Sequence, residues 1–370
     1  MNDLHGLIFA YRSDANLGEL TRPRNTCSVP FGGRYRLIEF MLSNYVNAGI
    51  PDVGVVVHKS YQSLLDHLGS GKDWDLSRKH GGLRLLPPFS YAERGGGEYR
   101  GSMYALAGVS DYLADIRQDY VIMGWGDIAV NLPVTEIFEQ HLATGADITV
   151  VCTPTLTGAP RHSEYVDVVD GRITDLSVHP AAADKALESL EVYILSKQLL
   201  LELVDYCAAH DIYNFSRGVL QARVNTLKLV PYIHQGYVGR FQSVSDYYQR
   251  SMELQDPAVR ADLFNDARPV RTHDHSNPST YYGPEAVSKQ SLVADGCRIE
   301  GTVENSVLSR GVIVEKGAKV VNSVLMQGTV VKADASLSYV IADKDVVVNE
   351  NRMLMGHATY PLAIAKGSVV

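Results

Sequence analysis

The sequence predicts an α/β domain over residues 1–265 and a parallel β-helix over residues 285–370, joined by a linker over 266–284. With 370 residues, the chain has the length of two or three domains. Its first part alternates short apolar runs with longer amphipathic stretches, as in strands linked by crossover helices. Its last part consists of short β-branched pairs between Gly, Asp, Lys and Asn, with almost no helical periodicity.

The strand and helix candidates of the first domain follow from these two patterns. Near-continuous aliphatic runs suit a parallel sheet that is covered on both faces, and they occur at 7–10, 53–57, 120–123, 147–152 and 192–195. Apolar residues at three- and four-residue spacing predict helices over 37–48, 61–68, 103–116, 134–141 and 197–208. In such a sheet, a nucleotide or sugar site lies beyond the carboxyl ends of the strands.

An internal repeat predicts the β-helix. The string NSVLSRGVI at 305–313 is echoed by NSVLMQGTV at 322–330, and a third copy begins at 338. An aliphatic residue recurs six positions on in each copy: Val307 to Ile313, Val324 to Val330 and Val340 to Val346. This step is typical of a triangular parallel β-helix, in which each face contributes one inward aliphatic residue. The alternative is an antiparallel sandwich with coincidental spacing.

Composition excludes several classes of function. The 34 Lys and Arg residues against 42 Asp and Glu give a net charge of −8, which argues against a nucleic-acid binder but permits a local basic patch. The four cysteines, Cys27, Cys152, Cys207 and Cys297, are too scattered for a disulfide framework or a zinc site, so free thiols are expected. No run approaches the ~18 apolar residues of a membrane span. We therefore expect a cytoplasmic protein that binds no membrane.

The linker contains two histidines that invite a metal-site interpretation. Residues 269–278 lack periodicity, and His273 and His275 lie within them. No third ligand is spaced to complete a metal site, so the sequence favours solvated linker histidines and predicts no bound metal.

Residues 20–44, LTRPRNTCSVPFGGRYRLIEFMLSN, are the most specific string in the chain. They resemble the start of a sugar-1-phosphate nucleotidyltransferase, specifically of the glucose-1-phosphate adenylyltransferase (ADP-glucose pyrophosphorylase) family of bacterial glycogen synthesis. The resemblance extends over essentially the whole chain, with further echoes at 100–102, 126–127 and 356–370. It implies a nucleotide-diphospho-sugar-transferase-like (Rossmann-like) domain followed by a left-handed β-helix.

The chain departs from the family pattern where that family binds phosphates. Catalytic members carry a G-G-x-G-x-R loop, whose glycines let backbone N–H groups approach the nucleotide. Here the aligned residues are YRSDAN at 11–16, so Tyr11, Arg12 and Asn16 replace loop residues and Asp14 adds a like charge. The lysine of the family's R-x-K-P motif is replaced by Thr26, which removes a positive charge from the place where the transition state gathers negative charge.

Two further departures affect the sugar phosphate and the metal. The lysine that grips glucose 1-phosphate in the family matches His179, whose imidazole is a poor substitute at pH 7. An aspartate that helps hold Mg²⁺ in the family matches Arg240, which leaves Asp127 as the surviving metal-binding carboxylate. The resemblance therefore implies no catalytic residues and no cofactor in this chain, with Mg²⁺ in a catalytic partner.

A different anion site is expected to survive near the domain boundary. The bacterial family binds an allosteric sugar phosphate or inorganic anion there, through arginines of the first segment. Arg24 and Arg36 fall on matching positions and Arg34 lies close, so the three form a candidate phosphate clamp. The alternative is that they pair with acidic neighbours such as Glu39 on a solvated face.

The leading hypothesis is a regulatory subunit of glucose-1-phosphate adenylyltransferase with little or no activity of its own. It would join the catalytic paralogue in a hetero-oligomer, expected to be a tetramer, and respond to a small phosphorylated effector. A homodimer is compatible with the chain when the partner is absent. One alternative is an active nucleotidyltransferase with a rebuilt site. Another is an acyltransferase, but that class uses a catalytic histidine and residues 305–348 contain none.

Overall fold

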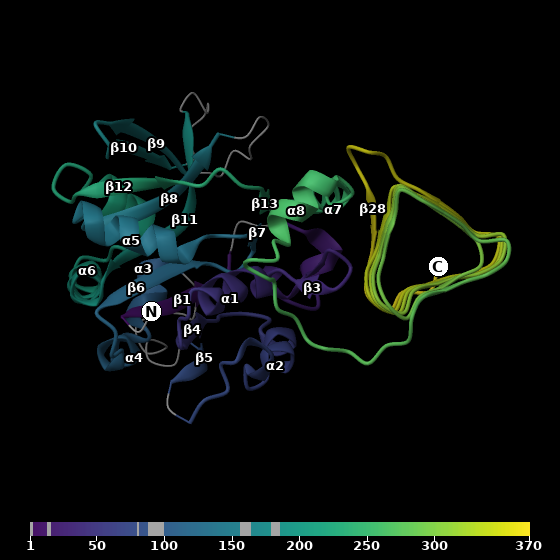
Figure 1. Ribbon diagram of the computed structural model, residues 1–370, viewed down its shortest axis with the longest axis horizontal. Helices are drawn as coiled ribbons and strands as arrows, with labels where there is room; N and C mark the ends of the chain where they lie inside the picture. The colour runs from purple at the N-terminus through teal and green to yellow at the C-terminus, as the bar shows by residue number, and fades with distance from the viewer. Residues whose placement is uncertain (1–2, 13–15, 80, 88–99, 156–163, 179–185) are drawn as a thin grey trace.

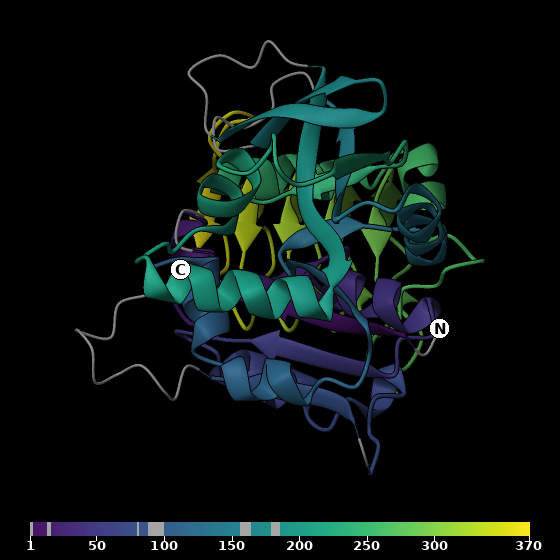
Figure 2. The same cartoon turned by 90° about the vertical axis from the view of Figure 1, so that its left-hand side faces the viewer.

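The computed structural model describes residues 3–12, 16–79, 81–87, 100–155, 164–178 and 186–370. It contains an N-terminal α/β domain and a three-sided β-helix, which Figure 1 shows end-on as a triangle. Figure 2, turned by 90°, has the α/β domain in front of the β-helix. The two-domain fold class expected from the sequence is confirmed. Asp14 and His179, two of the residues singled out by the sequence, lie outside the described residues.

The α/β domain is built on a nine-stranded sheet with the path β10-β9-β11-β6-β1-β4-β5, from which β8 and β12 continue beside β11. Its strands are β1 (Leu4–Phe9), β4 (Asp52–Val56), β5 (Gly82–Leu86), β6 (Tyr120–Trp125), β8 (Ile148–Pro154), β9 (Glu164–Val169), β10 (Arg172–Val178), β11 (Leu187–Ser196) and β12 (Leu229–Ile233). Strands β1, β4, β5 and β6 pair in parallel, and β12 is parallel to β8.

The sheet is mixed, so the expectation of parallel strands does not hold for β9, β10 and β11. Strand β11 runs antiparallel to β6, β8 and β9. A parallel neighbour needs a crossover, usually a helix, whereas the described chain between β8 and β11 contributes the antiparallel pair β9 and β10. Strand β11 therefore returns antiparallel to its neighbours.

Helices cover both faces of this sheet and enclose two apolar cores. One core contains Met103, Leu106 and Leu200, and the other contains Met41 and Ile137. The helices are α1 (Ile38–Asn47), α2 (Gln62–Leu68), α3 (Ser102–Ala107), α4 (Ser110–Asp115), α5 (Val134–Thr144), α6 (Lys197–Ala209), α7 (Val244–Glu253) and α8 (Pro257–Leu263). Short helical turns are η1 (Gly18–Thr21), η2 (Thr26–Ser28), η3 (Lys72–Trp74) and the π-type turn η5 (Ser216–Gln221). The single helix predicted over 103–116 is two helices, broken at Gly108 and Val109.

Two small two-stranded sheets lie outside the main sheet. Strands β2 (Pro30–Phe31) and β3 (Tyr35–Arg36) form an antiparallel hairpin. Strands β7 (Ile128–Val130) and β13 (Val238–Arg240) also pair antiparallel. Because β7 follows β6 directly, this second pair brings the end of β13 to the carboxyl end of β6.

The β-helix consists of three parallel five-stranded sheets, one per face. The first face has β14 (Tyr281–Tyr282), β17 (Arg298–Ile299), β20 (Ile313–Val314), β23 (Val330–Val331) and β26 (Val347–Val348). The second has β15 (Val287–Lys289), β18 (Thr302–Glu304), β21 (Lys319–Val321), β24 (Ser336–Ser338) and β27 (Met353–Met355). The third has β16 (Leu292–Val293), β19 (Val307–Leu308), β22 (Val324–Leu325), β25 (Val340–Ala342) and β28 (Leu362–Ile364). Strand β14 lies within the stretch that the sequence assigned to the linker.

The inward-facing residues match the repeat in its third copy but not in the first two. Val340 and Val346 belong to the interior, as predicted. In the first two copies the interior contains Leu308, Val314 and Leu325, whereas Val307 and Val324 pack with aromatic residues of the α/β domain. The predicted register is therefore displaced by one residue in these two copies. The reason is that the third face is buried on both sides, inside by its own core and outside by the other domain, so adjacent positions are both aliphatic.

The linker is fixed to the α/β domain rather than solvated. Arg271 donates its backbone N–H to Ser43 Oγ over 2.9 Å and accepts from Trp74 Nε1 over 3.2 Å. His273 Nδ1 lies 2.7 Å from Asp73 Oδ2. The expectation of solvated linker histidines is thus wrong for His273, because the chain must cross the domain boundary and its polar groups are bonded there.

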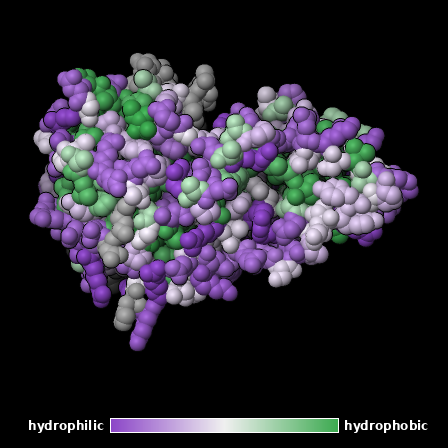
Figure 3. Space-filling model, in the orientation of Figure 1, coloured by the Kyte–Doolittle hydropathy of each residue, from purple (hydrophilic) through white to green (hydrophobic). Residues whose placement is uncertain are grey.

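The surface in Figure 3 interleaves hydrophilic and hydrophobic residues over both domains. Among the described residues, no helix combines the length and the apolar composition needed to cross a bilayer. Larger exposed apolar side chains occur at the end of the β-helix, where Met353 and Met355 of β27 are 72% and 68% exposed.

Candidate functional site

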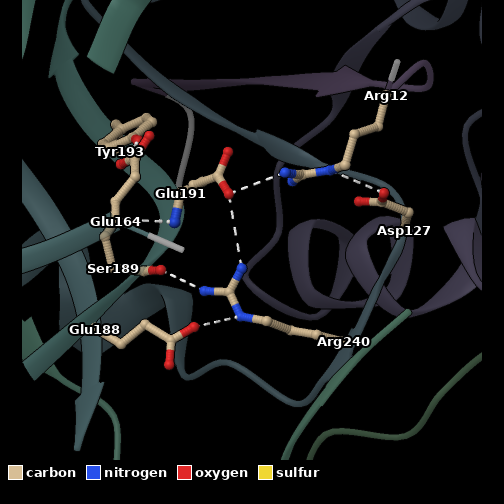
Figure 4. A network of polar contacts seen from close by, with 8 residues as sticks. All are labelled: Arg12, Asp127, Glu164, Glu188, Ser189, Glu191, Tyr193 and Arg240. Atoms are coloured by element: carbon tan, nitrogen blue, oxygen red, sulfur yellow. Dashed lines mark hydrogen bonds and ion pairs between the residues drawn. The ribbon is translucent and has the colours of Figure 1, made fainter. Parts of the chain in front are cut away.

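Three residues singled out by the sequence meet at the carboxyl ends of the parallel strands. Arg12 follows β1, Asp127 follows β6, and Arg240 ends β13. Arg12 Nε donates to Asp127 Oδ2 over 3.0 Å, and the Arg12 guanidinium lies 4.5 Å from the centre of the Trp125 ring. Figure 4 shows both arginines directed toward the same group of carboxylates. We call these contacts the arginine network.

Glu191 connects the two arginines. Its Oε1 accepts from Arg12 Nη1 over 3.0 Å and lies 3.6 Å from Arg240 Nη1. The residue sits in an irregularity of β11, where the register against β8 shifts between Ser189 and Val192. Glu191 has a φ of +56°, a conformation that favours glycine, so the backbone is strained to direct this carboxylate into the site.

Glu188 completes the arginine network on the side of β11. Its Oε1 lies 2.9 Å from Arg240 Nε, and the side chain is 0% exposed. Arg240 also donates from Nη2 to the carbonyl oxygen of Ser189. Together with Asp127 and Glu191, three buried or nearly buried carboxylates thus surround two guanidinium groups, so the cations offset most of the cost of burying these charges.

A cavity of about 240 Å³ opens beside the network. Its lining includes Arg12, Trp125 and Glu191, together with Glu164 of β9 and Tyr193 of β11. Glu164 Oε2 accepts from the Tyr193 hydroxyl over 2.8 Å. Burial, followed by the nearby charge of Glu191, raises the pKa of Glu164. The cavity therefore has both charged and aromatic side chains in its lining.

The residues present do not fit the Mg²⁺ ion that the family resemblance implies. Asp127 Oδ2 is bound by Arg12, and the position matched to a second metal-binding carboxylate carries the Arg240 cation. No group of three or more His, Cys, Asp or Glu side chains in the described residues is arranged to hold a metal ion. A guanidinium at this place repels a divalent cation.

The other loop residues named by the sequence lie around the network rather than in it. The Tyr11 ring contacts the His58 ring at 4.7 Å, and Asn16 donates its backbone N–H to Gln242 O over 2.8 Å. Thr26 is buried in η2. Sequence reasoning missed Glu188 and Glu191, because the strand candidate began at 192; the only signal was charge inside an apolar strand.

A second candidate site lies at the boundary between the two domains. This pocket, the domain-boundary pocket, has a volume of about 340 Å³. Arg34 and Arg36, two residues of the predicted clamp, contribute to it from the β2–β3 hairpin, while Arg310 and Lys344 come from the β-helix. The two β-helix cations were missed because nothing local in a repeat indicates which turn faces the other domain.

The cations of the domain-boundary pocket repel one another. Arg36 donates to Ser63 O and Ser63 Oγ over 2.8 and 2.9 Å, and neither Arg36 nor Lys344 has an ion-pair partner among the described residues. Burial and then Arg24 lower the pKa of Arg36 to about 10. Burial and then Arg36 lower the pKa of Lys344 to about 8. Such a pocket is suited to a bound anion, which would offset both effects.

Arg24 and Arg34 lie next to carboxylates, which the clamp hypothesis did not expect. Arg24 is buried against Asp343 and does not line the pocket. Arg34 lines it, about half exposed, with its Nε 3.8 Å from Asp295 Oδ1. Asp295 is also 3.3 Å from Arg310 Nε. The described pocket thus offers Arg36 and Lys344 as its uncommitted cations.

Glu39 pairs with a histidine rather than with these arginines. Its Oε1 lies 2.5 Å from His67 Nε2, and its carboxyl group is fully buried. Burial raises the pKa of Glu39 to about 8, and burial followed by Arg36 lowers the pKa of His67. Both directions favour a neutral pair, in which a protonated Glu39 carboxyl donates to a neutral imidazole.

Family models match both domains. A model described as Nucleotidyl transferase matches residues 13–252, and one described as GlmU-like, C-terminal hexapeptide matches residues 279–358. The chain is 36% identical over 369 residues to the glycogen biosynthesis protein GlgD of Bacillus subtilis (strain 168), covering 100% of this chain and 97% of that protein.

Geobacillus stearothermophilus provides a relative of each kind. Its glycogen biosynthesis protein GlgD is 36% identical over 324 residues, covering 86% of this chain and 83% of the relative. Its glucose-1-phosphate adenylyltransferase is 33% identical over 320 residues, covering 85% of this chain and 82% of the relative. These matches agree with the α/β domain and the β-helix of the fold. The chain therefore belongs to the glucose-1-phosphate adenylyltransferase family of nucleotidyl transferases.

Proposed function

We propose that this chain is a regulatory subunit of glucose-1-phosphate adenylyltransferase in glycogen biosynthesis and does not itself form ADP-glucose from ATP and glucose 1-phosphate. The observation that carries the proposal is the arginine network. Arg12 and Arg240 stand where the family's resemblance places a glycine-rich loop and a metal-binding carboxylate. The two guanidinium groups hold Asp127 and Glu191, so neither carboxylate is available to a metal ion.

Nucleotidyl transfer needs positive charge on the reacting phosphates and on the leaving diphosphate. In this chain the positive charges of the network are neutralised internally by buried carboxylates. Thr26 replaces one lysine of the family pattern, and the sequence has His179 at the other. A phosphate-binding role for Arg12 would leave Asp127 without this counter-charge and Glu191 with Arg240 alone.

Regulation would enter through the domain-boundary pocket. Arg36 and Lys344 provide two cations without carboxylate partners, and Arg34 and Arg310 lie beside them. A small phosphorylated effector would bind there through charge-assisted hydrogen bonds. Because the pocket takes residues from both domains, an effector would favour one arrangement of the domains and so bias a partner in the same oligomer.

The partner would be a catalytic paralogue, as the pair of relatives in Geobacillus stearothermophilus suggests. Strands β26, β27 and β28 end their three sheets, and β27 exposes Met353 and Met355. Residues 368–370 already pair with β26, so β27 is the sheet end that we propose for contact with another chain, in a hetero-oligomer expected to be a tetramer. A homodimer in the partner's absence would use the same end.

The test is ADP-glucose formation by this chain alone, by the catalytic paralogue alone and by the two co-purified. We expect no turnover alone and a raised rate or altered effector response in the mixture. The variant Met353→Glu/Met355→Glu should abolish the effect by preventing assembly, while Lys319→Glu on the exposed second face serves as a control. Robust turnover by the chain alone would overturn the proposal in favour of an active transferase with a rebuilt site.

A further inference from the structure

Another polar cavity lies at the opposite edge of the main sheet, where the parallel strands begin. We call it the strand-start cavity; its volume is about 450 Å³. His5 lies near the start of β1, Asp52 opens β4, and Gly82 opens β5. Helix α4 and the residues that follow it form the other wall, including Tyr112 and Gln118. None of its lining residues belongs to the arginine network or to the domain-boundary pocket.

The floor of this cavity is a set of buried polar side chains. His5 is 3% exposed and Gln118 is 7% exposed. Asp52 accepts from the Gly82 N–H and from Gln118 Nε2, each over 2.7 Å. The Tyr112 hydroxyl lies 3.0 Å from His5 Nε2. Burying such groups at the end of an otherwise apolar strand is costly, so the floor is not explained by the packing of the sheet.

His5 presents a buried nitrogen toward this floor. Burial lowers the pKa of His5 to about 4, so the ring is neutral at pH 7. With the Tyr112 hydroxyl donating to Nε2, Nδ1 carries the hydrogen and is a donor. Nδ1 is buried, and hydrogen bonding with Gln118 opposes the effect of burial on the pKa of His5. His5 and Gln118 therefore form one polar pair in the floor.

Three cations surround the opening, and no carboxylate in the described residues pairs with them. They are Lys79, Arg84 and Arg117. Some exposed arginines of this acidic protein pair with a nearby carboxylate, as Arg22 does with Glu19 and Arg298 with Glu300. The three cations of the opening differ in that they line one cavity together. Two carboxylates also line the cavity: Asp52 already accepts through both oxygens, and Asp115 is exposed, so the three cations outnumber the carboxylates of the lining by one.

The Arg84 guanidinium lies 5.9 Å from the centre of the Tyr112 ring, so one cation of the opening is held over the floor. Cations at the opening and hydrogen-bonding groups below are the two parts needed by a phosphate ester that carries hydroxyl groups. The volume exceeds what a bare phosphate ion fills.

We propose that the strand-start cavity binds a small phosphorylated metabolite that carries hydroxyl groups. Its phosphate contacts Arg84, Arg117 and Lys79, and its hydroxyl groups contact the floor formed by His5 and Gln118. The proposal stands independently of the regulatory function, because it concerns other residues at the other edge of the sheet.

Hydrogen–deuterium exchange locates this binding on the full-length chain. Inorganic phosphate and glucose 6-phosphate are the probes, titrated separately against the wild type and the variant Arg84→Ala/Arg117→Ala. A control variant, Lys319→Ala/Arg352→Ala, removes the same charge from exposed positions on the β-helix. We expect both probes to protect α4 and β5 from exchange in the wild type and the control. In the cavity variant, the probe concentration that gives half of this protection should be at least tenfold higher. Glucose 6-phosphate should have a lower midpoint than phosphate.

Three results would overturn the proposal. The first is protection of α4 and β5 that is unchanged in Arg84→Ala/Arg117→Ala. The second is protection confined to segments of the domain-boundary pocket. The third is an equal concentration of phosphate and glucose 6-phosphate at half of the protection, which would show that the floor contributes nothing to binding. The two substituted arginines are exposed, so the variant should fold, and its unfolding midpoint in urea verifies this.

Discussion

Arg24 donates to both carboxylate oxygens of Asp343, with Nη1 3.0 Å from Oδ1 and Nη2 2.9 Å from Oδ2. Arg24 precedes η2 in the α/β domain, and Asp343 follows β25 in the β-helix. Both side chains are buried. Asp343 Oδ1 also accepts from the backbone N–H of Lys344 over 2.7 Å. The pair therefore joins the domains and fixes the backbone that carries a cation of the domain-boundary pocket.

Removing one partner of this pair should be strongly destabilising. Arg24→Met leaves the Asp343 carboxylate buried without its counter-charge, which costs about 3–5 kcal/mol in other buried pairs. Urea unfolding of the full chain measures the loss. The double variant Arg24→Met/Asp343→Asn should recover part of it. Arg22→Met is the control, because Arg22 is exposed and pairs only with Glu19; it should change stability by less than ~1 kcal/mol. Equal effects of the two single variants would contradict the assigned role.

Arg240 should behave as a structural counter-charge rather than as a catalytic group. Arg240→Met leaves Glu188, which is fully buried, without its cation, and we expect a loss of about 3–5 kcal/mol in unfolding free energy. Glu188→Gln in the same chain should restore a substantial part. A double-mutant cycle from urea titrations gives the coupling energy. Additive effects of the two substitutions would show that the ion pair is not a unit.

Because the backbone at Glu191 is strained, its glycine and alanine variants should have an unusual order of stability. Glycine tolerates the φ of +56° and alanine does not, while both lose the contacts to Arg12 and Arg240. Glu191→Gly should therefore be more stable than Glu191→Ala, by ~1 kcal/mol, against the usual preference inside a strand. Glu188→Gly and Glu188→Ala, which carry no such strain, supply the matched comparison. A less stable glycine variant at 191 would show that the irregularity in β11 disappears once the carboxylate is removed.

The sequence predicted the fold better than the site. Helices and strands depend on residues that are close together in the sequence, whereas the site depends on contacts between residues that are far apart in it. Apolar periodicity located β1, β4, β6 and β8, and the hexad repeat located the coils of the β-helix. The prediction of a single helix over 103–116 was wrong because Gly108 and Val109 break it. The predicted inward register of the repeat was wrong where one face of the β-helix is buried on both sides. Local pattern does not encode what packs on the far side of an element.

The arginine network was predictable only in part. Arg12, Asp127 and Arg240 could be named because they replace or retain residues at positions of a familiar pattern. The carboxylates of β11 that hold the arginines could not, because they depend on the irregularity at Glu191. Likewise, the partner of Arg24 lies 319 residues away and was not foreseen. Arg34 and Arg36 of the clamp hypothesis line one pocket, and the binding of a phosphate there stays a prediction.

Replacing Lys344 should stabilise the chain in the absence of phosphate and remove the stabilisation that phosphate gives. Its pKa is lowered to about 8 by burial and by Arg36, so at pH 7 the folded chain carries a cation in unfavourable surroundings. Lys344→Met should raise the unfolding temperature in phosphate-free buffer by about 2 °C, the shift expected for ~1 kcal/mol in a chain of this size. Added phosphate should stabilise the wild type and not the variant. Lys366→Met, an exposed neighbour of the same charge, is the control. Equal stabilisation of wild type and Lys344→Met by phosphate would refute the anion site.

Glu39 predicts a loss of stability as pH rises through neutrality. Burial raises its pKa to about 8 in the folded chain, far above the ordinary value of about 4.5. Between these values the folded chain binds more protons than the unfolded chain, so unfolding free energy falls as pH increases. His67 acts in the opposite direction only below its ordinary pKa of 6.5, because its folded pKa is lowered.

Lys344, whose pKa is lowered to about 8, and Glu164, whose pKa is raised, also affect the pH dependence of stability between about pH 6.5 and pH 8. The contribution of Glu39 is therefore the difference between two variants of the chain. Urea unfolding at half-unit pH steps should give a more negative slope in the wild type than in Glu39→Gln, which keeps a hydrogen-bonding group beside His67. Asp66→Asn, a nearby carboxylate of the same pocket, should leave the slope unchanged. If Glu39→Gln kept the wild-type slope, the carboxyl would be ionised throughout this range and the pair with His67 would be charged.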